Sequence, residues 1–177
     1  MKATVKMNKK TFYLIVGLCA VIIMMNSIES FIKAKDTGLF EAWLQNPKLN
    51  IDRSQTINEM YSIYLTSCLS VFFIRIITPI ALSLNSYFSL VKTGVNKLFV
   101  AIWMVLTIGL FFFTTLGETY FSIFFIISVI CHIGLLCVLI YLWKDINKRL
   151  YILHKKRSKH KGGREIWKGS INLYMTI

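Results

Sequence analysis

The sequence predicts an all-α integral membrane protein with four transmembrane helices and with both termini on the cytoplasmic side. Three observations predict it: the composition, the length of the charge-free runs and the charge of the segments between them. The 177 residues are 55% hydrophobic and 16% charged, with a mean hydropathy of +0.59. Charge is absent from five runs of 18, 15, 16, 20 and 25 residues. This composition excludes a soluble enzyme domain, a disordered chain and a nucleic-acid-binding module whose basic residues cover a folded face.

The runs divide the chain into segments, because a helix needs about 20 apolar residues to cross the hydrocarbon core. In order, these are a basic N-terminus (1–10), a first span (11–31), a loop (32–59), a second span (60–91), a cytoplasmic turn (92–97), a third span (98–117), an outer turn (118–119), a fourth span (120–143) and a basic tail (144–177).

Three of these segments carry a further expectation. The basic N-terminus and first span have the form of a signal peptide, but no small-x-small motif follows, so we expect an uncleaved helix. The second span would extend roughly 48 Å, against a core of about 30 Å, so it must tilt, bend at Pro79 or begin as an interfacial turn. The turn between the last two spans has room only for a tight helical hairpin.

The charge of the segments sets the orientation, because short loops rich in Lys and Arg remain in the cytoplasm. With the N-terminus inside, the three cytoplasmic segments carry net charges of +4, +2 and +8, and the outer side carries −2. Every segment then obeys the rule. Within the outer loop, the spacing of Leu39, Phe40, Trp43 and Leu44 predicts a short amphipathic helix on the membrane surface, with an irregular connector as the alternative.

Arg75 is the one charged residue deep within a span, which makes it a candidate functional residue. Rotation by 100° per residue places a small or polar set near Arg75 and a large apolar set on the opposite side, so Arg75 is predicted to face into the bundle. The first set is Cys68, Thr78, Leu82, Ser86 and Ser89; the second is Ile63, Leu69, Phe73, Ile77, Ile80, Leu84, Phe88 and Val91.

The candidate partners of Arg75 are Glu29 and Glu118, both predicted at the outer boundary. We expect a structural pairing with one of them. Binding of a lipid phosphate or anionic substrate, and extension of the side chain to the interface, are the alternatives. His132 lies at a similar predicted depth, where an interhelical hydrogen bond is the expected role and a proton relay the alternative.

The basic tail is predicted to contact anionic lipids, since it follows directly after a span. Docking of a protein partner is the alternative, and no nucleic-acid partner is expected. The residues of this lipid contact are Lys155, Lys156, Arg157, Lys159 and Lys161.

No signature of catalysis or cofactor binding is found. The sequence lacks a Gly-rich phosphate loop, a His-Glu-x-x-His motif and a Gly-x-Ser-x-Gly motif, and it has no Cys-x-x-Cys spacing. Cys19, Cys68, Cys131 and Cys137 all lie in apolar runs and are predicted to be small buried side chains. We therefore expect no metal, no cofactor and no enzymatic activity.

The expected function is that of a small non-catalytic multi-pass protein: an accessory, regulatory or protective, immunity-like subunit of a larger membrane system. An oligomeric transporter or channel lined by Arg75 and His132 is the alternative, and a lipid-modifying enzyme that uses Arg75 for a phosphate is a third hypothesis. The partners expected are anionic lipids at the cytoplasmic face and a membrane protein or further copies of the chain. Lysine exceeds arginine 16 to 5, which suggests an AT-rich bacterial genome and a plasma-membrane location.

Overall fold

The structure, a computed structural model, describes residues 5–46, 56–116 and 122–174, with side chains as far as residue 152. Within these ranges the chain is all-helical, as predicted, and forms no strand. The five α-helices and one π-helical turn are α1 (Lys9–Lys35), α2 (Thr37–Leu44), α3 (Ile57–Phe88), η1 (Ser89–Thr93), α4 (Lys97–Leu116) and α5 (Ile123–Tyr174).

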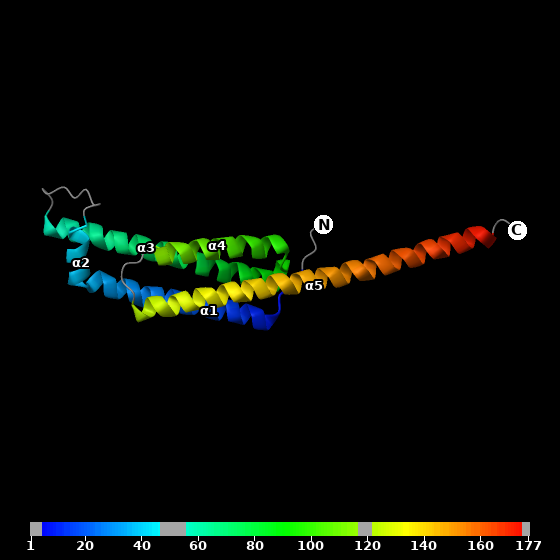
Figure 1. The fold of residues 1–177 in the computed structure, drawn as a ribbon, viewed down its shortest axis with the longest axis horizontal. Helices are drawn as coiled ribbons and strands as arrows, with labels where there is room; N and C mark the ends of the chain where they lie inside the picture. The colour runs from blue at the N-terminus through cyan, green and yellow to red at the C-terminus, as the bar shows by residue number, and fades with distance from the viewer. Residues whose placement is uncertain (1–4, 47–55, 117–121, 175–177) are drawn as a thin grey trace.

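Four of the helical segments are long and apolar enough to cross a membrane, which confirms the predicted number of candidate spans: Lys9–Lys35, Ile57–Thr93, Lys97–Leu116 and Ile123–Ile152. These helices lie side by side along one long axis (Figure 1). Helix α1 packs against α3 and α5, and α4 packs against α5. Helix α2 crosses one end of the bundle, and α5 projects past the other end (Figure 1).

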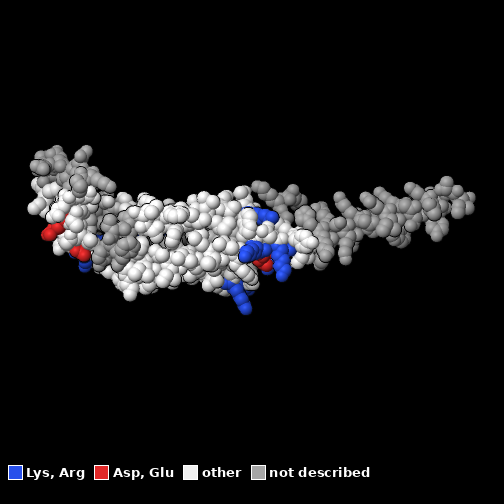
Figure 2. All heavy atoms as spheres, viewed as in Figure 1, with Lys and Arg blue, Asp and Glu red and all other residues white. Residues whose placement is uncertain are grey.

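Charged side chains gather at the two ends of the bundle and leave an uncharged belt between them (Figure 2). We call the end with α2 the α2 end; it carries both acidic and basic residues. We call the other the lysine-rich end, which includes Lys9, Lys10, Lys92, Lys97 and Lys144. The belt exposes large apolar side chains, among them Ile77, Val105 and Ile130, each more than 60% exposed. Such a surface is stable against lipid rather than water, so the fold supports a membrane location.

The predicted division of the second span into two faces is confirmed. Arg75, Leu82, Ser86 and Ser89 are buried, Cys68 and Thr78 are partly buried, and the eight apolar residues assigned to the opposite face are 40–66% exposed. The buried face meets an apolar core at which α1, α3 and α5 contribute Ile22, Leu82 and Leu139. Helical periodicity alone therefore identified the side of α3 that packs in the bundle.

Pro79 lies within α3, and its side chain is fully buried. Because proline has no N–H, the carbonyl of Arg75 receives no hydrogen bond from it. The helix continues on both sides, from Ile57 to Phe88, so the bend at Pro79 stays a prediction.

Helix α2 forms in the predicted segment of the loop, but its apolar residues contact protein. Phe40 is buried, and its ring centroid lies 5.2 Å from that of Tyr61 and 5.4 Å from that of Tyr64. The hydroxyls of Tyr61 and Tyr64 donate to the carbonyls of Ala34 and Lys33, at 2.9 and 2.8 Å. This aromatic cluster joins α1, α2 and α3, so α2 closes one end of the bundle.

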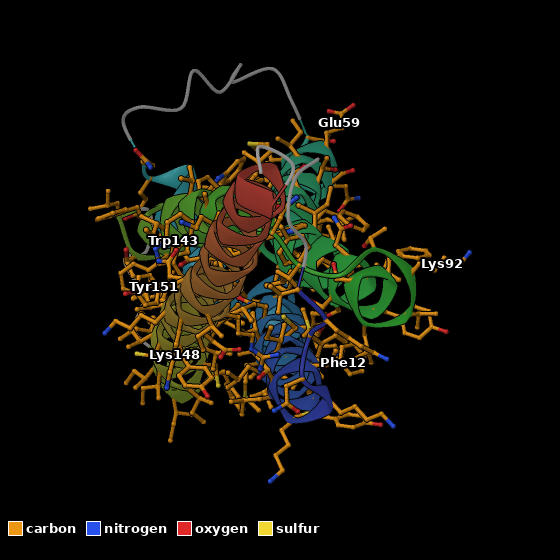
Figure 3. The ribbon with its side chains drawn as sticks, turned by 90° about the vertical axis from the view of Figure 1, so that its right-hand side faces the viewer. Phe12, Glu59, Lys92, Trp143, Lys148 and Tyr151 are labelled. Carbon is orange, nitrogen blue, oxygen red and sulfur yellow. The ribbon has the colours of Figure 1, made fainter. Side chains whose placement is uncertain are left out.

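The lysine-rich end is closed by a contact that connects the N-terminus to the connection between α3 and α4. Val5 and Val95 form an isolated antiparallel bridge, with N–H to O distances of 2.8 and 2.7 Å between their backbones. Directly before Val95, Gly94 caps the C-terminal end of η1 and has a φ of 67°. Figure 3 views the bundle from this end and shows α5 extending toward the reader.

Several element boundaries differ from those expected. Helix α5 begins at Ile123 and runs without interruption to Tyr174, past residue 143, where the last span was predicted to end. The predicted outer turn at 118–119 lies outside the described residues. The expectation of four buried cysteines is wrong for Cys137, which faces out of the bundle, and Cys68 and Cys131 are only partly buried.

Candidate functional site: a buried cluster of charged and polar side chains

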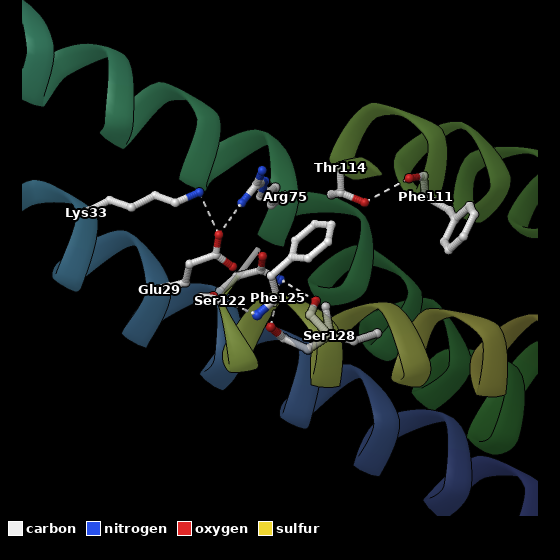
Figure 4. A network of polar contacts seen from close by, with 10 residues as sticks. Glu29, Lys33, Arg75, Phe111, Thr114, Ser122, Phe125 and Ser128 are labelled. Carbon is white, nitrogen blue, oxygen red and sulfur yellow. Dashed lines mark hydrogen bonds and ion pairs between the residues drawn. The ribbon is translucent and has the colours of Figure 1, made fainter. Parts of the chain in front are cut away.

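The cluster is centred on Glu29, a carboxylate that lies in the first candidate span and is 1% exposed. One helical turn later, Lys33 places its Nζ 2.7 Å from Glu29 Oε1. From α3, Arg75 places Nη1 3.4 Å from the same oxygen (Figure 4). The structure thus brings together two of the predicted site residues, Arg75 and Glu29. Glu118, the other candidate partner of Arg75, lies outside the described residues.

The two contacts with Glu29 are unequal. The distance to Lys33 is that of a short, charge-assisted hydrogen bond, whereas 3.4 Å is at the long end of the hydrogen-bonding range. Lys33 is also part-exposed at 19%, against 6% for Arg75. Lys33 therefore lies nearer the surface at the α2 end, while Arg75 carries its charge into the bundle.

Helical geometry explains why these three charged groups lie close together. Glu29 and Lys33 are four residues apart on α1, so they lie on one face about 6 Å apart along the axis. Arg75 comes from the antiparallel helix α3, and its side chain leans toward the N-terminus of that helix, which is the α2 end. The ion pair therefore joins α1 to α3 near this end of the uncharged belt.

A second group of buried polar side chains joins α1 to α5. Asn26 Nδ2 donates to the carbonyl of Ile22 at 2.8 Å and to the hydroxyl of Ser128 at 3.2 Å. Asn26 precedes Glu29 by three residues, so the two side chains lie on adjacent parts of one helix face. The hydrogen bond between Asn26 and Ser128 extends the polar cluster from the ion pair to α5.

His132 lies one helical turn beyond Ser128 on α5, and the hydrogen bond that the structure gives it lies within this helix, not between helices as predicted. It is 1% exposed, and its Nδ1 lies 2.8 Å from the carbonyl oxygen of Ser128. A carbonyl only accepts, so Nδ1 carries the proton and Nε2 of the neutral ring is left as an acceptor. Among the described residues, Nε2 has no hydrogen-bond partner.

Sequence reasoning missed Asn26, Lys33 and Ser128 as members of the cluster. A signal for each was present: Asn26 and Glu29 are three residues apart, Glu29 and Lys33 are four apart, and Ser128 and His132 are four apart. Such spacings place two polar residues on one helix face. The signal was weak because one residue of each pair, taken alone, is typical of a membrane boundary or of a small side chain packed between helices.

In this cluster, the buried charges of Glu29 and Arg75 compensate one another, and polar contacts hold neighbouring helices together. Among the described residues, no group of three or more His, Cys, Asp or Glu side chains could hold a metal ion. Polar contacts between helices within a membrane typically contribute about 0.6–2 kcal/mol each, and a buried charge that lacks compensation is strongly unfavourable. Glu29 and Asn26 together link α1 to both α3 and α5, so the cluster fixes the relative register of three helices.

The remaining predicted site residues lie apart from the cluster. Pro79 is one turn beyond Arg75 on α3. The side chains of Lys155, Lys156, Arg157, Lys159 and Lys161 lie outside the described part of the structure, although their backbone belongs to α5. Comparison of the chain with protein-family models, curated proteins and solved structures found no match.

Proposed function

We propose that this chain is a small non-catalytic multi-pass membrane protein that acts as an accessory, regulatory or protective, immunity-like subunit of a larger membrane system. The observation that carries the proposal is the length of α5. Its 52 residues extend about 78 Å, more than twice the thickness of a hydrocarbon core. The helix projects past the bundle (Figure 1). In this proposal, the projecting part lies outside the membrane and contacts the larger system.

The proposed orientation has both termini in the cytoplasm. It is supported by the gathering of lysines at one end of the bundle, where Asp145 is the one acidic side chain that the structure describes. In this orientation the α2 end faces outward, and the basic part of α5 lies beneath the membrane. There, Lys155, Lys156, Arg157, Lys159 and Lys161 contact anionic headgroups, each contributing about 1 kcal/mol.

Labelling from outside the cell tests the orientation. In a variant without native cysteines, Lys35→Cys at the α2 end should react with a membrane-impermeant maleimide in intact cells. Lys97→Cys, at the lysine-rich end, should react only after the cells are lysed. The opposite pattern would reverse the proposed topology.

Co-purification tests the accessory role. The full chain extracted in mild detergent should carry a different membrane polypeptide at a fixed stoichiometry, identified by mass spectrometry. Deletion of residues 153–177 should release that polypeptide and leave the four-span bundle folded. A lone homo-oligomer that conducts ions or solute in liposomes would contradict the proposal.

The alternative is an oligomeric transporter or channel in which Arg75 and His132 line the path. One observation supports it, the buried acceptor Nε2 of His132. Against it, Arg75 and His132 are 5% and 1% exposed, so the packed helices enclose both side chains. A flux assay in liposomes distinguishes the two proposals: His132→Leu should abolish transport if the alternative holds.

We also propose that α3 bends at Pro79. Spin labels placed at exposed Leu69 and Leu84 in a chain without native cysteines should lie closer together than in a straight helix. Replacement of Pro79 by Ala should lengthen that distance. An unchanged distance would contradict the proposed bend.

A further inference from the structure

Three hollows on the surface of the described residues differ in their lining. One, lined by residues of α1 and α3, is mainly apolar, and a second, which includes Lys10, Leu14 and Tyr141, mixes polar and apolar side chains where the belt meets the lysine-rich end. The third, of about 390 Å³, is lined by Lys6, Ser89, Leu90, Val91, Lys92, Thr93 and Gly94. We call it the lysine hollow. It lies at the lysine-rich end, between the N-terminal segment and η1.

We propose that the lysine hollow binds a phosphate group, carried by an anionic phospholipid or free in solution. Two ammonium groups supply the charge. The Thr93 hydroxyl, which donates a long hydrogen bond of 3.4 Å to the carbonyl of Phe88, is a neutral donor that can exchange this bond for one to a phosphate oxygen. No acidic side chain is among the lining residues. Two cations beside a shared hollow repel one another unless an anion lies between them, so a bound phosphate relieves that repulsion.

The fold brings these groups together from distant parts of the sequence. Lys6 follows Val5, whose N–H and carbonyl are both bonded to Val95, so the N-terminal segment is held beside Gly94. The positive φ of Gly94 turns the chain out of η1 at this point. Lys92 extends away from the bundle in Figure 3, and its four-carbon stem lets the ammonium group rotate toward an anion at the rim.

The backbone contributes little to this site. The hollow lies at the C-terminal end of the α3–η1 segment, where helix carbonyls give a partial negative charge. Gly94 N–H is already bonded to the carbonyl of Ser89 at 3.0 Å. Binding of an anion therefore depends on the two lysines, which makes their replacement a decisive test.

The position favours a lipid as the carrier of the phosphate. Apolar, exposed Val91 lines the hollow, and exposed Phe88 precedes it on the same helical segment, so the polar lining adjoins the uncharged belt. A phospholipid with its phosphate in the hollow would place its acyl chains along this surface of α3. The site is defined by geometry alone and does not rest on the proposed accessory function.

The test uses the full chain in a neutral detergent, titrated with dioleoylphosphatidylglycerol and, separately, with inorganic phosphate, and monitored by native mass spectrometry. The double variant K6Q/K92Q should bind phosphatidylglycerol about tenfold or more weakly than the native sequence. The matched control, K9Q/K97Q, removes the same charge from the same end outside the hollow and should change affinity by less than about twofold.

The outcomes separate the explanations. If K6Q/K92Q, but not K9Q/K97Q, loses affinity for phosphatidylglycerol, the ligand is a lipid phosphate. If K6Q/K92Q loses affinity only for inorganic phosphate, the source is a soluble phosphate. Equal weakening in the two double variants would show that only overall charge matters and would overturn the site. If K6Q/K92Q binds both ligands as tightly as the native sequence, the proposed site is also overturned. Thermal unfolding of both variants, expected within about 2 °C of the native chain, confirms that they are folded.

Discussion

Each end of the bundle has an ion pair between residues four apart on one helix, but the pair is buried at the α2 end and exposed at the lysine-rich end. At the α2 end, Glu29 is 1% exposed and forms an i,i+4 ion pair with Lys33 at 2.7 Å. At the lysine-rich end, Asp145 forms an i,i+4 ion pair with Arg149 at 2.9 Å, but the two side chains are 27% and 43% exposed. Spacing and distance are nearly equal. Burial distinguishes the two pairs, and burial decides what each pair does.

The difference follows from the medium around each pair. A buried carboxylate beside two cations stabilises the assembly of helices because the surroundings supply no alternative solvation. An exposed pair exchanges with water and contributes little. The α2 end therefore uses charge to fix its own structure, whereas the lysine-rich end leaves most of its charge available to ligands outside the bundle. Four predictions, some with control variants, test this contrast, from the largest expected effect to the smallest.

Replacement of Glu29 by Gln should destabilise the protein most. The substitution removes the carboxylate that the structure shows beside Arg75 and Lys33, and loss of one partner of a buried pair costs about 3–5 kcal/mol. We expect the apparent melting temperature in detergent to fall by on the order of 10 °C.

Two further variants sharpen this result. Glu41→Gln, which removes an exposed carboxylate on α2, should have almost no effect. The double variant E29Q/R75M should recover part of the loss, because it removes a buried cation together with its anion. A double variant less stable than E29Q alone would show that Arg75 has a second, larger structural role.

Replacement of Gly94 by Ala should destabilise the lysine-rich end by about 1–2 kcal/mol, because a φ of 67° is unfavourable for a residue with a Cβ atom. Hydrogen exchange should increase at Val5 and Val95, whose bridge follows directly from this turn. Gly109→Ala is the control: no atom lies within 4 Å of the added Cβ in α4, so the protein should be unchanged or slightly more stable. Equal effects of the two variants would argue against strain at Gly94.

Replacement of Asn26 by Leu should destabilise the protein by about 0.6–2 kcal/mol, the range of interhelical hydrogen bonds in membranes. The variant removes the bond from α1 to Ser128 on α5. Ser27→Ala is the matched control, since the Ser27 hydroxyl donates to the carbonyl of Ile23 in its own helix. Thermal unfolding in detergent measures both. A larger loss for Ser27→Ala would contradict the assignment of Asn26 as the link between α1 and α5.

Replacement of Asp145 by Asn should change stability by less than about 0.5 kcal/mol. The small effect should also vanish as the salt concentration rises from about 50 mM to about 500 mM, because exposed pairs are screened. Glu29→Gln provides the comparison within the same protein, and its effect should persist at high salt. An Asp145 variant as unstable as the Glu29 variant would remove the distinction between the two ends.

The positions that the sequence predicted well depend on local geometry. Arg75 faces the bundle, and the eight apolar residues of the opposite face point outward, because both follow from a rotation of 100° per residue within one helix. The contacts between helices were harder to predict. The sequence left two glutamates, Glu29 and Glu118, as candidate partners of Arg75. The packing of α1 against α3, which places Glu29 beside Arg75, cannot be inferred from either helix alone.

By itself, the sequence determined that the chain is helical, that four helices are long and apolar enough to span a membrane, and which face of the second is buried. These properties are fixed by run length and periodicity along a single segment. Only the tertiary structure decided that Asn26 joins Ser128, that Cys137 faces outward and that Val5 pairs with Val95. Each of these depends on how one element packs against another, whereas spacing within a single helix shows at most which residues share a face.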